Sequence, residues 1–422
     1  MAREFKDSGI EWIGQIPREW KVSKIGNLYQ VRNEKVSDKD YAPLSVTMNG
    51  IVPQLETAAK TNNGDDRKKV CVGDFAINSR SDRRGSCGVS QYEGSVSLIN
   101  TILKPRDSMN SQYYNWLFHT ELFADEFYRW GHGIVDDLWT TRWQEMKNIS
   151  IVFPSLPEQQ KIADYLDKVC GEVDEMVSLQ EKMIEELKAY KQSVITEAVT
   201  KGLNPNVPMK DSGIDWIGEI PEGWKVIRLK DIFSLKTGTT PKDFEKCSDD
   251  DTRINWFTPS DIDDMNCELN NSQRYLSKKV VQNEGIQLYP KGSLIFVGIG
   301  ASAGKIGYAN IEGYSNQQIT AFISQEENCC SKYCYYYMIA DRKRIRDNAF
   351  FTTLPIINNS YLSRVAVLYP PLSEQQQIAS YLDTKCSEID SLIAIKQQKI
   401  EDLKEYKKSV IYEYVTGKKE VV

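Results

Sequence analysis

A glycine-rich segment in the second half of the chain holds a lysine and could bind a phosphate or a nucleotide. Residues 296–307 read FVGIGASAGKIG. A Walker-type phosphate loop would need glycine at position 299 and serine or threonine at position 306, but the sequence has Ile299 and Ile306. A dinucleotide-binding fingerprint would need a further glycine where Ala303 stands. Neither nucleotide motif is therefore present.

Neither this segment nor the rest of the sequence gives much support for a catalytic activity. The start of the same segment, Phe296–Gly300, is compatible with binding S-adenosylmethionine, but an adenine methylase also needs an Asn/Asp-Pro-Pro-aromatic strip, and the sequence contains none. Only two histidines, His119 and His132, are available for acid–base or nucleophilic chemistry. The cysteine cluster at 329–334 lacks the C-x-x-C spacing of a zinc site. A binding protein without catalytic residues is therefore favoured over an enzyme.

A further interpretation treats the glycine-rich segment as a corner that binds nucleic acid. The stretch aligned with it in the first half, residues 75–86, reads FAINSRSDRRGS and also runs from an apolar strand into a polar loop with glycine. Such loops let the backbone approach a phosphate while guanidinium and amide groups reach base edges. A solvated surface turn is the structural alternative.

The chain consists of two copies of one larger unit. Residues 210–229 match residues 6–25 at 13 of 20 positions, and residues 373–416 match residues 157–200 at 23 of 44. Repeats this long indicate duplicated domains, not the short units of a solenoid. The first block, rich in tryptophan and glycine, is interpreted as a structural strap that leads into each domain. Two copies imply pseudo-two-fold symmetry and hence a target with two halves.

Each copy ends in a predicted long helix. Apolar residues recur in 162–194 at alternating steps of four and three, which predicts a coiled-coil seam flanked by Val177 and Ile184. The seam of the second copy is weaker because lysines occupy three of its positions. The two helices are expected to pair antiparallel within the monomer. The main seam and partner-binding residues are expected to be Ile162, Leu166, Val173, Met176, Leu187, Tyr190, Leu382, Ile389, Leu392, Leu403 and Tyr406.

The composition fits a two-domain protein that binds DNA only locally. The chain has 422 residues, 27% of them charged, and a net charge of −6. An acidic protein does not coat DNA over its whole surface, so a nucleic-acid site must be a local patch. Nine cysteines, scattered over both copies, indicate reduced thiols. No stretch approaches the roughly 18 apolar residues that span a bilayer, so we expect a cytoplasmic protein without a membrane partner.

The repeated motifs resemble those of the specificity subunits of type I restriction-modification systems. Each copy opens with Asp-Ser-Gly-Ile-x-Trp-Ile-Gly-x-Ile-Pro-x-x-Trp and ends its helix with Tyr-Lys-x-Ser-Val-Ile-x-Glu. Each helix begins with Leu-x-Glu-Gln-Gln-x-Ile-Ala-x-Tyr-Leu-Asp. The resemblance covers essentially the whole chain.

The resemblance implies an α+β fold. Two mixed α/β target recognition domains alternate with two long helices that pair as an intramolecular antiparallel coiled coil with pseudo-two-fold symmetry. The expected boundaries are 1–156 for the first recognition domain, 157–203 for the first spacer helix, 204–371 for the second recognition domain, and 372–422 for the second helix and C-terminal tail. Each domain is expected to read one half of an asymmetric split site in double-stranded DNA.

The resemblance also implies partners. The helices would set the gap between the half-sites and dock two methylase subunits, which carry S-adenosylmethionine and methylate adenine at N6. Restriction subunits that use ATP and Mg to translocate and cut DNA would join them, and this chain would hold no cofactor and no catalytic residue. Two alternatives remain: a coiled-coil scaffold for methylase subunits without sequence-specific DNA binding, and a methyltransferase built on Phe296–Gly300.

The family pattern also indicates which residues bind DNA. Residues 238–241, Gly-Thr-Thr-Pro, resemble the start of a recognition domain, and residues 302–305 resemble a later loop of it. The first half departs from this pattern at 34–36 and 83–86, which implies unlike half-sites. The expected DNA-binding residues are Asn78, Arg80, Arg83, Arg84 and Ser86 in the first domain, and Thr239, Thr240, Lys242, Ser302 and Lys305 in the second.

Overall fold

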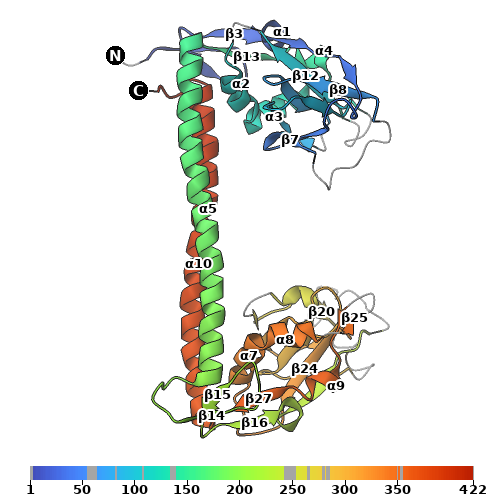
Figure 1. Cartoon of the computed structure of the whole chain (residues 1–422), viewed down its shortest axis with the longest axis vertical. Coiled ribbons are helices and arrows are strands. Elements are labelled where there is room, and N and C mark those ends of the chain that lie inside the picture. Colours follow the sequence, from blue (N-terminus) through green and yellow to red (C-terminus); the bar gives the residue numbers. More distant parts are fainter. Residues whose placement is uncertain are drawn as a thin grey trace. The chain divides into compact units, whose positions relative to one another are not determined.

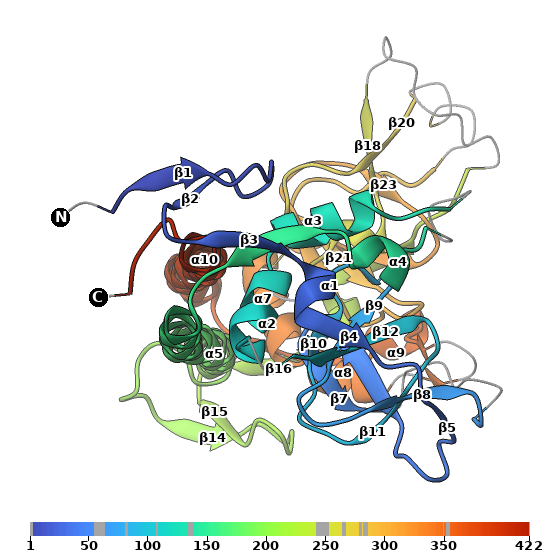
Figure 2. The same ribbon diagram turned by 90° about the horizontal axis from the view of Figure 1, so that it is seen from above.

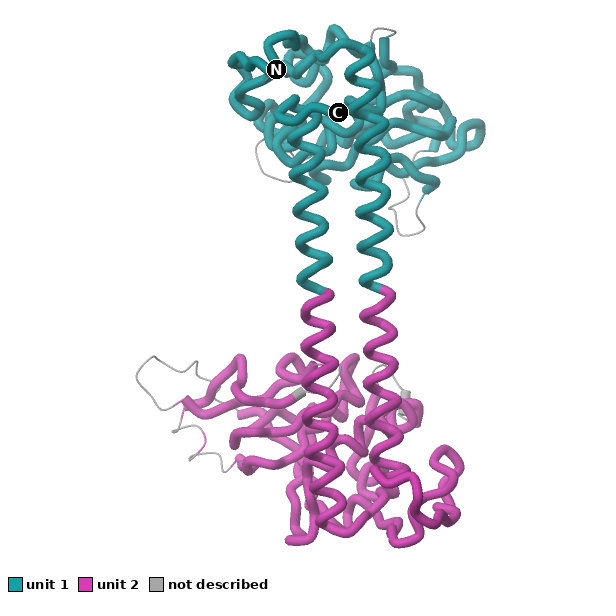
Figure 3. The backbone as a smooth tube through the Cα atoms, turned by 90° about the vertical axis from the view of Figure 1, so that its left-hand side faces the viewer, with its two compact units in different colours: residues 1–181, 397–422 teal, residues 182–396 magenta. Residues whose placement is uncertain are grey.

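The computed structural model (Figure 1) describes residues 3–54, 64–80, 83–106, 109–133, 139–241, 253–263, 267–277, 281, 286–348, 350–351 and 355–421. Contacts divide the chain into two units, residues 1–181 with 397–422 and residues 182–396 (Figure 3). Each unit holds one α+β domain together with part of each long helix.

The first domain is built on an antiparallel sheet covered by helices. Its elements are β3 (Lys21–Lys24), α1 (Ile25–Leu28), β4 (Tyr29–Val31), β5 (Lys35–Val36), β6 (Leu44–Thr47), β7 (Gly50–Pro53), β8 (Arg67–Val70), β9 (Phe75–Asn78), β10 (Cys87–Val89), β11 (Gly94–Val96), β12 (Asn100–Pro105), α2 (Ser111–Phe118), α3 (Glu121–Arg129), α4 (Trp143–Met146) and β13 (Ser150–Phe153). The main sheet has the order β10-β9-β12-β4, and a smaller one has the order β11-β8-β5. Helix α2 packs on the main sheet through Phe118, whose ring centroid lies 5.0 Å from that of Phe75. The continuous apolar run of β9 is buried on both faces, as its central position requires.

The second domain repeats this plan with an extra strand. Its elements are β16 (Lys225–Arg228), η3 (Leu229–Asp231), β17 (Phe233–Thr237), β18 (Ile254–Phe257), η4 (Pro259–Asp261), β19 (Cys267–Leu269), β20 (Arg274–Leu276), β21 (Leu294–Val297), β22 (Ile306–Ala309), β23 (Tyr314–Ser315), β24 (Ile319–Ser324), α7 (Ser331–Ala340), α8 (Arg342–Asp347), β25 (Phe350–Phe351), β26 (Pro355–Ile356), α9 (Asn359–Leu362) and β27 (Ala366–Tyr369). The main sheet has the order β17-β24-β21-β22-β19, and a smaller one has the order β20-β18-β23. Strand β21 therefore takes the central place that β9 has in the first domain.

Two long helices, α5 (Leu156–Lys201) and α10 (Leu372–Val415), run antiparallel to each other in both units. In the first unit Lys407 Nζ donates to Asp174 at 2.6 Å, and in the second Lys191 Nζ donates to Asp390 at 2.6 Å. A later residue of α5 therefore pairs with an earlier residue of α10, as in an antiparallel pair. The two ion pairs are also equivalent in the repeat, which reflects the pseudo-two-fold symmetry. The predicted α+β fold with a paired antiparallel coil is confirmed.

The register of the predicted seam is wrong at alternate positions. Met176, Tyr190, Leu392 and Tyr406 are 48–58% exposed, although we expected them between the helices. The inward positions lie one residue later, and in α5 they hold Cys170, Val177, Ile184 and Lys191. In α10 they hold Cys386, Ile393, Ile400 and Lys407. The sequence pattern predicted the wrong register for two reasons. Apolar residues occupy both the inward positions and the exposed positions next to them, and a lysine occupies one inward position in each helix. Ile162, Leu166, Val173, Leu382 and Ile389 are buried as predicted, and Leu187 and Leu403 are partly buried.

Removing Asp390 is expected to cost more stability than removing Asp174, although the two pairs are equivalent in the repeat. Lys191 is 2% exposed and would keep a buried unpaired charge, whereas Lys407 is 26% exposed and can be hydrated. We expect Asp390→Ala to lower the free energy of unfolding by roughly 2 kcal/mol and Asp174→Ala by less than about 1 kcal/mol. Urea denaturation of the two variants measures the difference. Lys191→Met, which removes the buried charge, is the control and should be nearly neutral; equal losses from the two aspartate variants would contradict the burial argument.

Each domain is fastened to the start of a long helix by the same contacts. The strand that enters the domain pairs with the strand that leaves it, β3 with β13 and β16 with β27. A buried glutamine in the first helical turn then accepts a backbone hydrogen bond from the domain, Gln159 from Asn110 and Gln375 from Cys330, both at 2.8 Å. The predicted helices are therefore continuous with the domains that they follow.

The repeated N-terminal block forms a strap between the two long helices. It contains the hairpin β1 (Phe5–Asp7) with β2 (Gln15–Pro17), and in the second copy β14 (Met209–Asp211) with β15 (Glu219–Pro221). Buried Trp20 and Trp224 donate their indole N–H groups to Glu158 and Glu374 at 2.8 and 3.0 Å. Figure 2 shows the first hairpin beside the end of α10, where Lys418 Nζ donates to the carbonyl of Ile13 at 2.8 Å. These contacts support the structural interpretation of the block.

Two further properties concern only the described part of the chain. No helix there is both long and apolar enough to cross a bilayer. No group of three or more His, Cys, Asp or Glu side chains there is arranged to hold a metal ion.

In the cysteine cluster at 329–334, the sulfur atoms of Cys329 and Cys334 lie 3.7 Å apart, and the hydrogen bond between them lowers the pKa of Cys329.

Candidate nucleic-acid interface

Three segments of the second domain meet at one end of its main sheet. They are residues 298–305 after β21, residues 238–240 after β17, and residues 316–318 before β24. Gly298 N donates to the carbonyl of Gln318 at 2.8 Å, and Thr239 N donates to the carbonyl of Ser315 at 3.0 Å. These bonds hold the three segments side by side.

Glycine at position 238 allows this close approach. A Cβ atom there would lie 2.3 Å from the carbonyl oxygens of Ser315 and Asn316, which no side chain tolerates. The following residues, Thr239 and Thr240, are exposed, and the hydroxyl of Thr240 donates to the amide oxygen of Gln317. The Gly-Thr-Thr sequence thus combines a tight backbone contact with two accessible hydroxyl groups.

The first domain has the same loop with different side chains. In the second domain Val297 N donates to Lys305 O at 2.9 Å, and Lys305 N donates to Ser302 O at 3.1 Å. In the first domain Asn78 N donates to Ser86 O at 2.8 Å, and Ser86 N donates to Arg83 O at 3.1 Å. Arg83 therefore occupies the place of Ser302, and Ser86 the place of Lys305. The two loops thus share the same closing hydrogen bonds but carry unlike side chains.

The predicted residues of the first domain divide into two groups. Asn78 and Ser86 are each only 4% exposed, and the Asn78 side chain accepts a hydrogen bond from Arg80 N at 3.0 Å. They shape the loop and do not present their side chains to a ligand in this conformation. Arg80, Arg83 and Arg84 are exposed, although Arg84 forms an ion pair with Asp125 of α3. In the first domain, only these arginines among the five predicted residues present their side chains for direct contact with DNA.

The predicted residues of the second domain are all accessible where they are described. Ser302 and Lys305 are partly exposed, and Lys305 Nζ donates to the carbonyl of Ile262 at 3.3 Å. Lys242 lies outside the described residues. Thr239 and Thr240 lie on the neighbouring segment, so four of the five residues come together at one end of the sheet.

The segment that precedes the last main strand in each domain was not predicted to belong to the site. In the second domain it presents Gln317 and Gln318, whose amides are suited to adenine. In the first domain the equivalent residues are Leu98 and Ile99, 38% and 36% exposed, which are suited to a thymine methyl group. The equivalence follows from the hydrogen bond of Ser79 N to Ile99 O, which matches that of Gly298 N to Gln318 O. The run Asn-Gln-Gln before an apolar strand was the available signal.

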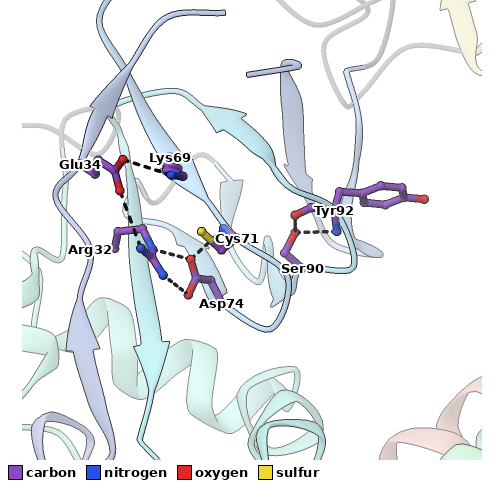
Figure 4. Close-up of polar contacts among 7 residues, drawn as sticks. All are labelled: Arg32, Glu34, Lys69, Cys71, Asp74, Ser90 and Tyr92. Carbon is purple, nitrogen blue, oxygen red and sulfur yellow. Dashed lines mark hydrogen bonds and ion pairs between the residues drawn. The ribbon is translucent and has the colours of Figure 1, made fainter. Parts of the chain in front are cut away.

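A polar network holds the start of β9, at the end of the strand opposite to the arginine loop (Figure 4). Asp74, 2% exposed, accepts two hydrogen bonds from the Arg32 guanidinium at 2.7 and 3.1 Å, and one from Cys71 N at 2.9 Å. The hydrogen bond to Asp74 raises the pKa of Arg32. Because Asp74 directly precedes β9, the network holds the strand whose end carries the arginine loop.

Comparisons with known proteins agree with one another. A family model described as a type I restriction modification DNA specificity domain matches residues 17–189 and 221–405. The MjaVIII specificity subunit of a type I restriction enzyme of Methanocaldococcus jannaschii is 24% identical over 96% of this chain and 94% of its own length. The EcoDI specificity subunit of Escherichia coli is 20% identical over 90% of this chain and 86% of its own length. A solved chain described in terms of complex assembly and conformational transition of the type I R-M system shares the fold, with a TM-score of 0.74, 14% identity, and coverage of 95% of this chain and 98% of that one.

Proposed function

The chain belongs to the type I restriction-modification DNA specificity family, and we propose that each of its two domains reads one half of an asymmetric, bipartite site in double-stranded DNA. One observation carries this proposal: the same loop occurs at the same end of both main sheets but presents arginines in one domain and serine, threonine, lysine and glutamine in the other. A shared backbone with unlike side chains is what two different half-sites require.

The two loops favour different base edges. Exposed arginines form bidentate hydrogen bonds with guanine in the major groove, so Arg80 and Arg83 favour guanine in the first half-site. Leu98 and Ile99 offer apolar contact to a thymine methyl group. In the second domain Gln317 and Gln318 favour adenine. The two halves of the site are therefore expected to differ in sequence.

The long helices are proposed to space the half-sites and to dock two methylase subunits. Each helix has an exposed apolar pair three residues apart, Met176 with Leu179 on α5 and Leu392 with Ile395 on α10, and all four are 48–64% exposed. Residues three apart lie on one face of a helix. Because the two pairs are equivalent in the repeat, they fit two copies of one partner. The partners are proposed to supply S-adenosylmethionine, ATP, Mg and every catalytic residue.

Charging one apolar pair is expected to remove one methylase and leave the other. Each buried Met or Leu contributes about 1.5 to 3 kcal/mol, so Met176→Glu with Leu179→Glu should weaken one of the two docking events at least about tenfold. Mass photometry of the complex counts the bound methylases. Lys168→Glu with Lys182→Glu, at exposed positions of the same helix, is the control. A variant that still binds two methylases with unchanged affinity would contradict this docking face.

A footprint of the assembled complex tests the function as a whole. Hydroxyl-radical cleavage of bound DNA is expected to show two protected segments separated by a less protected gap, and only when this chain is present with the methylase. Assembly of the complex without any sequence-dependent protection would favour the scaffold alternative instead.

A further inference from the structure

The second domain contains a basic hollow beside the loop that is proposed to read bases. It has a volume of about 330 Å³ and lies between residues 301–305 and helix α8. Its polar lining comes from Ser302, Lys305, Arg342 and Arg346, and none of the described residues that line it is acidic. Three positive side chains thus surround one small space open to solvent.

The local fold turns two arginines of α8 toward this hollow. Arg342 and Arg346 are four residues apart and share one face of the helix. Gly304 has a φ of +92°, which favours glycine, and a Cβ atom there would lie in ordinary contact with Arg346 Cβ at 3.4 Å, so α8 packs directly beside the loop. Arg344 has a different role, because its guanidinium donates to buried Asp341 at 2.6 Å. Lys343 is 92% exposed, does not line the hollow and pairs with Asp347.

The first domain has the corresponding hollow with the opposite charge. It has a volume of about 500 Å³ and lies between Arg84–Gly85 and helix α3. The first and fifth residues of α3 line it, Glu121 and Asp125, where α8 has its two arginines. Asp125 forms an ion pair with Arg84, the loop arginine at this place. Arg84 is therefore paired with an acidic residue of its own hollow, whereas the charged side chains that line the described part of the second hollow are all basic.

From this contrast we propose that Arg342 and Arg346, with Lys305 and the Ser302 hydroxyl, bind one phosphate of the DNA backbone next to the half-site read by the second domain. A phosphate accepts hydrogen bonds from guanidinium, ammonium and hydroxyl groups, and such contacts fix register without reading sequence. This proposal rests on the proposed function. It adds that the two domains bind the DNA backbone with different side chains. Arg342 and Arg346 are positioning residues for the base contacts of the neighbouring loop.

The salt dependence of DNA binding tests the proposal. We compare the methylase complex of the wild-type chain with that of Arg342→Gln/Arg346→Gln, and use Lys343→Gln as a control that removes charge from the same helix. Each phosphate contact contributes about 0.9 to the slope of log K against log salt, so the double variant should lose about one unit of slope. Its affinity should fall roughly tenfold, while the methylated sequence stays the same. Equal losses in the Lys343→Gln complex would overturn the proposal, because diffuse charge would then explain the effect.

DNA in which single phosphates are replaced by uncharged groups can locate the proposed phosphate contact. Methylphosphonate groups placed one at a time along the DNA should weaken wild-type binding at one position beside the second half-site and should leave the double variant unaffected there. A double variant that responds as the wild type does at every position would overturn the site. Weak competition by inorganic phosphate at constant ionic strength is expected, because DNA is the proposed ligand; tight binding of free phosphate without any effect on DNA would contradict that source. Thermal melting of the variants checks folding, and a wild-type complex without specific DNA binding would instead refute the proposed function.

Discussion

Replacing Arg80 and Arg83 with alanine is expected to abolish recognition of one half of the DNA site and to leave the other half and the gap unchanged. Both side chains are exposed on the loop after β9. Each bidentate contact with a base contributes about 1 to 3 kcal/mol of discrimination, which corresponds to roughly 5- to 150-fold. The measurement is the rate of adenine methylation by the assembled complex on duplexes in which one half-site at a time is scrambled. The wild-type complex should require both halves, and the variant only the second.

Matched variants separate recognition from folding. Arg18→Ala removes an arginine of the same unit that is 72% exposed and pairs with Glu4, and it should change neither half. Thr240→Ala with Gln317→Ala should relax only the half read by the second domain. Loss of both halves together in the Arg80/Arg83 variant, with an earlier melting transition, would show that the loop serves folding and not recognition.

Removing one heptad from both long helices is expected to shorten the gap by about three base pairs. Within the first unit, residues 175–181 of α5 lie opposite residues 400–406 of α10, because Asp174 pairs with Lys407. Deleting both segments keeps the seam in register and shortens each helix by about 10 Å, at about 1.5 Å per residue. Because the deletion reaches into the proposed docking pair of α5, it is combined with Glu186→Leu, which puts leucine at the place of Leu179. Since base pairs are about 3.4 Å apart, the preferred gap should change by about three of them. Methylation of a series of duplexes with different gaps measures the optimum.

Insertion of one heptad at the same place is the complementary variant and should lengthen the gap by the same amount. Both variants should keep their half-site sequences, because neither deletion nor insertion touches the loops. A gap that stays the same in both would contradict the role of the helices as a spacer.

The repeated blocks made most of the fold predictable. Two matching segments near residues 6–25 and 210–229, and two helices with a common pattern, predicted duplicated α+β domains and an antiparallel pair, and the structure has both. The seam register was less predictable because Tyr190 is apolar and lies next to Lys191, the residue that is buried. A pattern of residue types cannot show that a lysine is buried when its partner, Asp390, comes from the other helix.

The candidate site was predictable in position but not in detail. The loops after β9 and β21 lie where the strand-to-loop pattern placed them, and their described residues form matching backbone hydrogen bonds. Residue type did not reveal that Asn78 and Ser86 turn inward, because their burial depends on hydrogen bonds within the loop. Leu98 and Ile99 were missed because exposed apolar residues do not stand out in a sequence. The contribution of α8 depends on its packing beside residues 301–305, which are distant in the sequence and which no local pattern encodes.

The central claim is that this chain alone sets the sequence of a bipartite DNA site. The most direct measurement is to co-express the chain with its neighbouring methylase in a host that lacks adenine methylation, and to map N6-methyladenine across the genome by long-read sequencing. We predict one split motif, with two unlike short halves separated by a fixed gap. Absence of any motif, when the complex is shown to assemble, would contradict the claim and leave the chain as an assembly scaffold.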